Sequence, residues 1–310
     1  FKELIRPEDK FEFFFDTPNR YEEQSAYDWL DAVTADLHTA TRQGDSTAIR
    51  AYQLLQAHLY FDLGDYNKSV ALANDIYLDI PDSDRESMRT LLELIDKNYG
   101  QLQLYDKQIE IRKEKRERGF TQNIAFYDIY SSLGMHRKAL KDYIFEMKKN
   151  IDNTNLYQLA EYDNTVGGFL LKDNTAAAAL SYFKKAQGYI VVYMNDIQNV
   201  KTDKEVAQAE LLKAIIEGNI GKSNVQLTQY REALPHLENS IAVLEDQHRE
   251  MYRPEIAENT LALAEAHMEL GNLEKAREYL EMDLSGIPVE LVLQRNRLLA
   301  YYYDRIEDYG

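Results

Sequence analysis

The chain has 310 residues, no cysteine and a formal net charge of −17, from 36 Lys and Arg against 53 Asp and Glu. An acidic chain of this kind argues against nucleic-acid binding and favours a cationic or uncharged partner. The lack of cysteine excludes disulfides, thiolate zinc sites and iron–sulfur clusters. Glycine and proline number only 13 and 6, and no long apolar run is present, so the composition predicts helices joined by short turns without a membrane span in this segment.

The first segment, residues 1–24, is rich in aromatic side chains, with Phe11, Phe13, Phe14 and Phe15 close together. We expect this segment to pack as a cap on the first helical hairpin of the chain. Residues 25–42 then predict an amphipathic helix, with Tyr27, Leu30, Val33 and Leu37 on one face.

A short pattern recurs along the chain: a turn, an aromatic or apolar residue, and a small residue three positions later. The clear copies are Leu63–Ser69, Leu133–Ala139 and Leu270–Ala276. Weaker copies place turns at Gln103, Asn174 and Thr228. Amphipathic helices flank each turn, so the repeated unit is predicted to be a helical hairpin in which the small residue lets the two backbones approach closely. Pro81 and Pro288 follow two of the clear copies and predict helix ends.

This pattern resembles the tetratricopeptide repeat, a helix–turn–helix unit with Leu-Gly and Tyr in its first helix, Ala and Phe in its second, and Pro at its end. The residues that carry the resemblance are Leu63-Gly64-Asp65-Tyr66 with Pro81, Val166-Gly167 with Ala179, Phe183 and Ala186, Ile220-Gly221 with Tyr230 and Ala233, and Leu270-Gly271 with Ala276 and Pro288. The resemblance implies an all-α solenoid of about six to seven hairpins, coiled as a right-handed superhelix. We expect the repeat array over residues 25–290.

The last segment, residues 291–310, reads as the first helix of a further, incomplete repeat. A hairpin that lacks its second helix leaves an apolar face uncovered. We therefore expect the natural protein to continue beyond Gly310, or two chains to pair through this helix as a homodimer.

No group of residues indicates an enzyme. The six histidines, His38, His58, His136, His236, His248 and His267, have no metal-ligand spacing, and we expect neither metal nor cofactor. The segment Gly218–Ser223 ends in Gly-Lys-Ser like a phosphate-binding loop, but it lacks the earlier glycine and lies inside a helical pattern. Gly221 is better explained as a close-packing residue. The charged run Arg112–Arg118 is interleaved with Glu114 and Glu117, which predicts a solvated helix face.

The remaining candidate site is the concave groove that the first helices of a repeat array line. The resemblance implies that peptides or protein tails bind there. Asn164 and Asn219 are the foremost candidates, since an amide both donates and accepts hydrogen bonds. Helical spacing predicts the following groove residues: His58, Phe61, Glu93, Lys97, Asp128, Asn164, Lys172, Asn219, Lys222, Glu265 and Met268.

The expected function is therefore a non-enzymatic module that binds a peptide or protein. In style the chain is similar to the repeat regions of bacterial sensor histidine kinases and transcriptional regulators, which implies an extracytoplasmic, periplasmic domain tethered to a membrane by a following helix. The alternatives are a cytoplasmic scaffold or co-chaperone-like adaptor and a peptide-responsive regulator.

Overall fold

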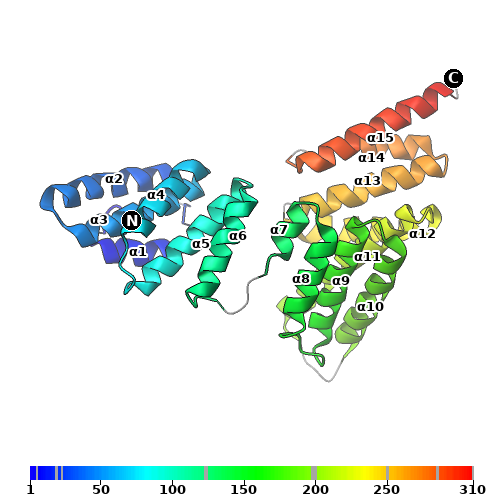
Figure 1. Cartoon of the computed structure of the whole chain (residues 1–310). Helices are drawn as coiled ribbons and strands as arrows, with labels where there is room; N and C mark the ends of the chain where they lie inside the picture. Colours follow the sequence, from blue (N-terminus) through cyan, green and yellow to red (C-terminus); the bar gives the residue numbers. More distant parts are fainter. Residues whose placement is uncertain are drawn as a thin grey trace. The chain divides into compact units, whose positions relative to one another are not determined.

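The structure, a computed structural model, describes residues 1–4, 6–17, 20–21, 24–121, 125–196, 201–248, 251–283 and 286–308. In these residues it contains fifteen α-helices and no strand (Figure 1). The chain divides into two compact units, residues 1–124 and 125–310. The repeat pattern contains no sign of this boundary, and each unit is described by itself.

The helices of the first unit are α1 (Pro7–Asp16), α2 (Ala26–Gln43), α3 (Ser46–Asp62), α4 (Tyr66–Asp79), α5 (Arg85–Gln101) and α6 (Tyr105–Glu117). Those of the second are α7 (Tyr127–Ser132), α8 (His136–Met147), α9 (Leu156–Lys172), α10 (Ala176–Asn195), α11 (Asp203–Gln226), α12 (Tyr230–His248), α13 (Arg253–Glu269), α14 (Leu273–Glu281) and α15 (Val289–Asp308).

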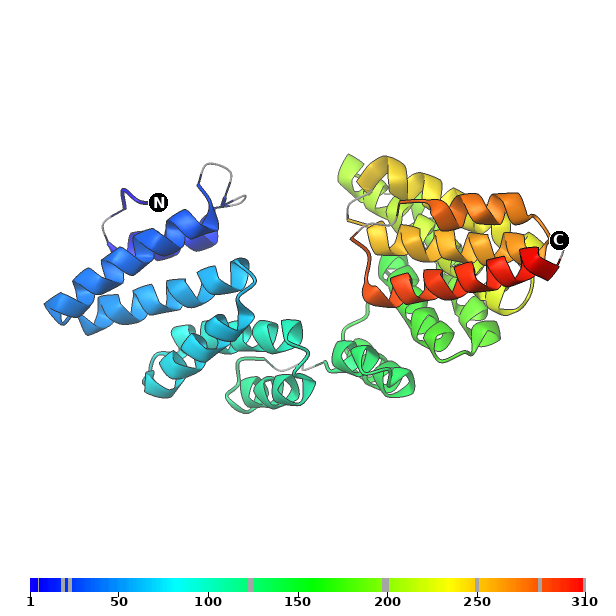
Figure 2. The same cartoon turned by 90° about the horizontal axis from the view of Figure 1, so that it is seen from above.

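Helices pack on their neighbours in chain order, so that pairs such as α3 with α4, α9 with α10 and α11 with α12 form hairpins. Odd-numbered helices also contact one another: α1, α3 and α5 in the first unit, and α9, α11, α13 and α15 in the second. Figure 2 shows the hairpins following one another from blue to cyan and from green to red. The prediction of an all-α, tetratricopeptide-like array of helical hairpins is therefore confirmed.

Each predicted hairpin turn is closed by one residue with a left-handed backbone. At Gly64, φ is 78°, its amide donates to the carbonyl of Phe61, and the Asp65 amide donates to the carbonyl of Tyr60, both at 2.9 Å. These two bonds form a Schellman motif, which satisfies carbonyls that the end of a helix leaves free. The same pair of bonds closes all six predicted turns, with positive φ at Gly64, Gln103, Gly134, Asn174, Thr228 and Gly271.

The small residue of the pattern lies in the interface between the two helices of each hairpin. Ser69, Ala139, Ala179, Ala233 and Ala276 are all fully buried. Ser69 shows how close the approach is, because its Oγ donates to the backbone carbonyl of Ala57 at 2.7 Å.

Gln108 stands at this position in the α5–α6 hairpin and is the exception. The opposite helix carries Gly100, where an added Cβ would lie only 2.9 Å from Gln108 Nε2. Gln108 Nε2 donates to Asp96 Oδ1 at 2.9 Å, and Arg112 Nε also contacts this carboxylate. A glycine on one helix thus makes room for a larger polar side chain on the other.

The aromatic N-terminal segment forms α1, which packs on α3. Phe14 is fully buried and lies 6.1 Å from Trp29 of α2, ring centroid to ring centroid. Lys10 is also buried, and its ammonium forms an ion pair with Asp36 of α2. These contacts attach α1 to the next two helices.

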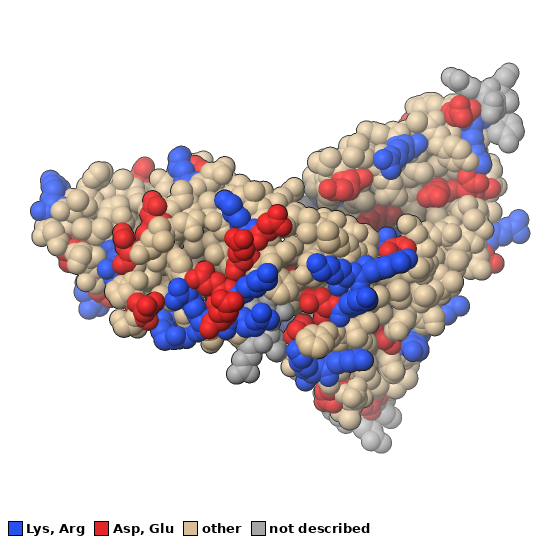
Figure 3. Space-filling view, in the orientation of Figure 1, with Lys and Arg blue, Asp and Glu red and all other residues tan. Residues whose placement is uncertain are grey.

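Acidic and basic residues are interspersed along α5 and α6, and Figure 3 shows red and blue side chains intermixed on the face that it draws. Arg118 Nε donates to Glu114 Oε1 at 2.9 Å, one turn earlier on the same run. This pair agrees with the predicted solvated, ion-paired helix face.

Helix α15 packs on α13 and α14, and both ribbon views place it beside them. Leu291 and Tyr302 join the core of this end. Val292, Leu293 and Tyr303 are 41%, 53% and 52% exposed. Within the described residues no later helix covers this face.

We expect the protein to become more stable when glycine replaces a β-branched residue at the position of positive φ in one of the six turns. We expect Thr228→Gly to raise the free energy of unfolding by about 1 kcal/mol, because a left-handed backbone is costly for a β-branched residue. Thermal melting followed by circular dichroism measures this. The same replacement at Thr165, inside α9, should lower the melting temperature instead. A lower melting temperature for Thr228→Gly would contradict backbone strain at this turn.

Candidate functional sites

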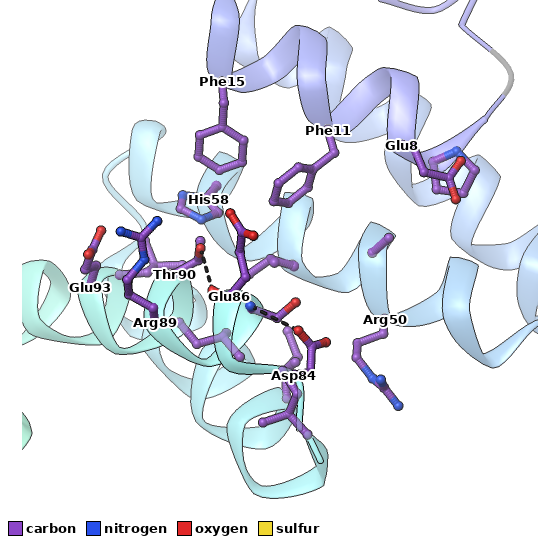
Figure 4. Close-up of a pocket in the computed structure, with 18 of the residues that line it drawn as sticks. Glu8, Phe11, Phe15, Arg50, His58, Asp84, Glu86, Arg89, Thr90 and Glu93 are labelled. Carbon is purple, nitrogen blue, oxygen red and sulfur yellow. Dashed lines mark hydrogen bonds between the residues drawn. The ribbon is translucent and has the colours of Figure 1, made fainter. Parts of the chain in front are cut away.

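The first unit contains a groove with a volume of about 780 Å³ between α1, α3 and α5, which we call the unit-1 groove. Figure 4 shows Phe11 and Phe15 directed from α1 toward the groove, with His58 of α3 beneath Phe15. Its lining residues are Pro7, Glu8, Phe11, Glu12, Phe15, Asp16, Thr47, Arg50, Ala51, Leu54, His58, Ile76, Ile80, Asp84, Glu86, Ser87, Arg89, Thr90, Leu91, Glu93, Leu94 and Lys97.

His58 forms the aromatic floor of the unit-1 groove. Its ring lies 4.9 Å from the Phe15 ring, edge to face, and 5.8 Å from Phe14. Burial first, and then the charges of Lys97 and Arg20, lower the pKa of His58 to about 3, so the imidazole is neutral at physiological pH. The structure thus brings together the predicted groove residues His58, Glu93 and Lys97.

The second unit contains a groove of about 480 Å³, lined mainly by α9, α11 and α13, which we call the unit-2 groove. It brings together four of the predicted residues, Lys172, Asn219, Lys222 and Glu265. The full lining is Gly168, Leu171, Lys172, Ile215, Asn219, Lys222, Val225, Gln226, Pro254, Glu255, Glu258, Ala262, Glu265 and Gln294.

Asn164 and Asn219, the two foremost candidates, are hydrogen-bonded to each other. Asn219 Nδ2 of α11 donates to Asn164 Oδ1 of α9 at 2.9 Å, and both side chains are half-buried. An asparagine amide has two donor hydrogens and two acceptor lone pairs. Within the described residues, the other amide hydrogen and the side-chain oxygen of Asn219 have no partner, while Asn164 orients the Asn219 amide.

Two acidic side chains of the unit-2 groove differ in their environment. Glu258 forms an ion pair with the Lys222 ammonium. Glu265 has no such partner within the described residues, and its pKa is raised, first by burial and second by the nearby charge of Glu269. Glu269 itself is paired with Arg305 of α15. Glu265 is thus a half-buried carboxylate of the unit-2 groove without an ion pair in the described structure.

Four predicted groove residues line neither groove. Asn164 is one of them and is connected to the unit-2 groove only through its hydrogen bond to Asn219. Met268 is fully buried in the core with Leu261 and Leu280, so its inclusion in the groove is corrected: its thioether has no surface to offer a ligand. Phe61 packs edge to face on Tyr66, ring centroids 5.4 Å apart, and closes the α3–α4 hairpin. Asp128 is exposed on α7 and lines neither groove.

The phosphate-loop-like segment is part of the helix core. Gly221 lies within α11, where an added Cβ would meet Leu237 Cγ at 2.5 Å and the Ala233 carbonyl at 3.3 Å. This is the close-packing role predicted for Gly221. Lys222 points to Glu258 across the groove.

Among the described residues, no group of three or more His, Asp or Glu side chains has the geometry to hold a metal ion. Nor does any helix formed by these residues have the length and apolar character needed to cross a membrane.

Several groove residues escaped the sequence analysis. Glu258 and Gln294 face the same groove as Lys222 but belong to α13 and α15. The sequence predicts a cap for the segment that contains Phe11 and Phe15, and in the structure Phe15 is also 39% exposed and lines the unit-1 groove. In the sequence, only the spacing of Phe11 and Phe15, one helical turn apart on the same face, indicates that both could line a groove.

Comparisons with known proteins yield structural similarities alone: no family model and no curated protein matches the chain. The crystal structure of the C-terminal part of a TPR repeat-containing protein from Cytophaga hutchinsonii is 14% identical, with a TM-score of 0.46, over 86% of this chain and 94% of that one. BtubC from P. vanneervenii is also 14% identical, with a TM-score of 0.33, over 90% of this chain and 92% of that one. The fold assignment stands on the packing of the helices into hairpins.

The environment of Glu265 predicts a pH-dependent effect on stability. Because the folded state raises the pKa of this carboxyl group, its ionised form destabilises the fold above that pKa. We expect Glu265→Gln to raise the melting temperature at pH 7 by a few degrees, consistent with a change of about 1 kcal/mol. The difference in melting temperature between the natural chain and Glu265→Gln should vanish as the pH falls to the range in which an ordinary glutamate is protonated, because position 265 then carries no charge in either protein. Glu278→Gln, on an exposed position of α14, serves as the matched control and should change little. An equal melting temperature at pH 7 would show that Glu265 bears no such cost.

Proposed function

We propose that this protein is a non-enzymatic interaction module that binds a peptide segment of another protein in the unit-2 groove. The observation that carries the proposal is the meeting of Asn219, Lys172, Lys222 and Glu265 from three inner helices in one groove. The hairpin-repeat fold supports it, because such arrays build extended concave binding surfaces.

The chemistry of the unit-2 groove suits an extended peptide. The amide of Asn219 can donate to a peptide carbonyl and accept from a peptide N–H, with its orientation fixed by Asn164. Glu265 is placed to accept a positively charged side chain of the ligand, and binding such a charge would offset the cost of burying the carboxylate. Lys172, which is exposed at the rim, can bind an acidic group.

Peptide binding is tested by screening an array of short synthetic peptides against the full chain and measuring the affinity of the hits by fluorescence anisotropy. We expect Asn219→Ala and Glu265→Gln each to weaken binding by about tenfold. The control Glu278→Gln should leave the affinity unchanged. Asn164→Ala should weaken binding less, because it only releases the Asn219 amide. If the peptides bind all four variants with the same affinity as the natural chain, the unit-2 groove is not the peptide-binding site.

We also propose that the module serves as the sensor or interaction region of a larger signalling protein and lies outside the cytoplasm. This rests on the similarity in style to the repeat regions of bacterial signalling proteins. The measurement uses alkaline phosphatase, a reporter that is active only outside the cytoplasm, fused directly after residue 310 in the natural gene, so that the reporter lies on the same side of any following membrane helix as the module. Activity is the expected result. An inactive but stable fusion would support the cytoplasmic scaffold or adaptor instead.

A further inference from the structure

The unit-1 groove differs from the unit-2 groove in having an aromatic wall. Phe11 and Phe15 lie on the same face of α1, with ring centroids 4.6 Å apart. Phe15 is 39% exposed, although it lies beside the buried ring of Phe14. Leu54 and Leu94 continue the apolar surface on α3 and α5. An aromatic or large aliphatic side chain of a ligand would bury this exposed surface.

The rims of the unit-1 groove are predominantly acidic. Six carboxylates line it, from Glu8, Glu12, Asp16, Asp84, Glu86 and Glu93, against three cationic side chains, from Arg50, Arg89 and Lys97. Glu12 and Asp16 lie on the α1 rim, and Glu86 and Glu93 lie on the α5 rim. None of these four forms an ion pair within the described part of the chain. The α5 rim also carries Arg89 and Lys97, so the excess of negative charge is larger on the α1 rim. Carboxylates without an ion pair on both sides of an apolar wall complement a segment that has cationic groups on both sides of an apolar residue.

The floor of the unit-1 groove carries a polar atom without a partner. His58 Nε2 is buried and makes no hydrogen bond in the described structure. A buried polar group without a partner costs free energy, which a ligand group that bonds to it would recover. The exposed Phe15 ring covers His58 from the side of α1, so a ligand group reaches the imidazole nitrogen only when this ring moves aside.

From the aromatic wall, the acidic rims and the unpartnered imidazole nitrogen together, we infer that the unit-1 groove binds a cationic peptide segment anchored by a tyrosine. The tyrosine ring packs on Phe11 and Phe15, and its hydroxyl group hydrogen-bonds with His58 Nε2. Lysine or arginine side chains on either side of the tyrosine pair with Glu12 and Asp16 on one rim and with Glu86 and Glu93 on the other.

This site lies in the other unit from the groove of the proposed function and does not depend on it. Variants of Asn219 or Glu265 should leave binding to the unit-1 groove intact. Failure of either proposal is therefore seen separately.

The probe is a fluorescein-labelled synthetic peptide with one central tyrosine and lysines on both sides, measured by anisotropy with the full chain. We expect saturable binding that weakens as salt is added. A peptide with glutamates in place of the lysines should not bind. Binding of both peptides with equal affinity would overturn the charge complementarity.

Matched variants test the two parts of the site. Glu12→Gln with Glu86→Gln should weaken binding by about tenfold, whereas Asp31→Asn with Glu110→Gln, which neutralises two exposed carboxylates of the same unit outside the groove, should not. Phe15→Ala should weaken binding by a similar factor. Phe13→Ala, on the same helix and equally exposed at 38%, should have no effect. If each groove variant binds the peptide with the same affinity as its control variant, the unit-1 groove is not the binding site.

The role of His58 is tested by comparing anchors. Replacing the peptide's tyrosine by phenylalanine should weaken binding to the natural chain by about fivefold, the loss of one hydrogen bond. With His58→Phe the two peptides should bind equally, and thermal melting confirms that this variant is folded. Equal affinity of the two peptides for the natural chain would overturn the hydrogen bond to His58, whether or not the variant folds.

Discussion

Every hairpin of this protein depends on a single backbone residue that turns left-handed where the first helix ends. At that residue the chain reverses, and the two hydrogen bonds of the Schellman motif consume carbonyls that would otherwise be exposed. The reversal also fixes where the second helix starts, and hence which residue meets the first helix five positions later. A buried alanine or serine occupies that place in five of the six predicted hairpins, and Gln108 occupies it in the α5–α6 hairpin.

Each unit has one groove along its own odd-numbered helices, and the two grooves offer different chemistry. In the second unit the groove is polar, with paired and unpaired charges and one oriented amide. In the first unit α1 contributes two phenylalanines, and the groove combines this aromatic wall with carboxylates on both rims. A common scaffold thus positions two unrelated sets of side chains, and fold alone determines neither ligand.

The sequence was informative where local geometry demands a particular residue. Glycine at Gly64, Gly134 and Gly271 marks a positive φ, and the buried alanines after the turns follow from the spacing. Helical spacing in the sequence also predicted groove residues correctly in both units. These are His58, Glu93 and Lys97 in the unit-1 groove and Lys172, Asn219, Lys222 and Glu265 in the unit-2 groove. The sequence could not reveal that Asn164 and Asn219 bond to each other, because their distance depends on how α9 and α11 pack. Met268 was misplaced for a related reason: the helix it occupies is buried almost all round, so periodicity does not identify a free face.

The pairing of Gly100 with Gln108 has a consequence for how this sequence can change over time. A side chain at position 100 would collide with the glutamine amide, while a small residue at position 108 alone would leave a void and strip Asp96 of a hydrogen bond. A side chain at position 100 displaces the flexible end of Gln108 and costs its hydrogen bond to Asp96, so a change at either position alone lowers stability. Related chains should show the two positions changing together, with glycine and glutamine exchanged as a pair for a larger and a smaller residue.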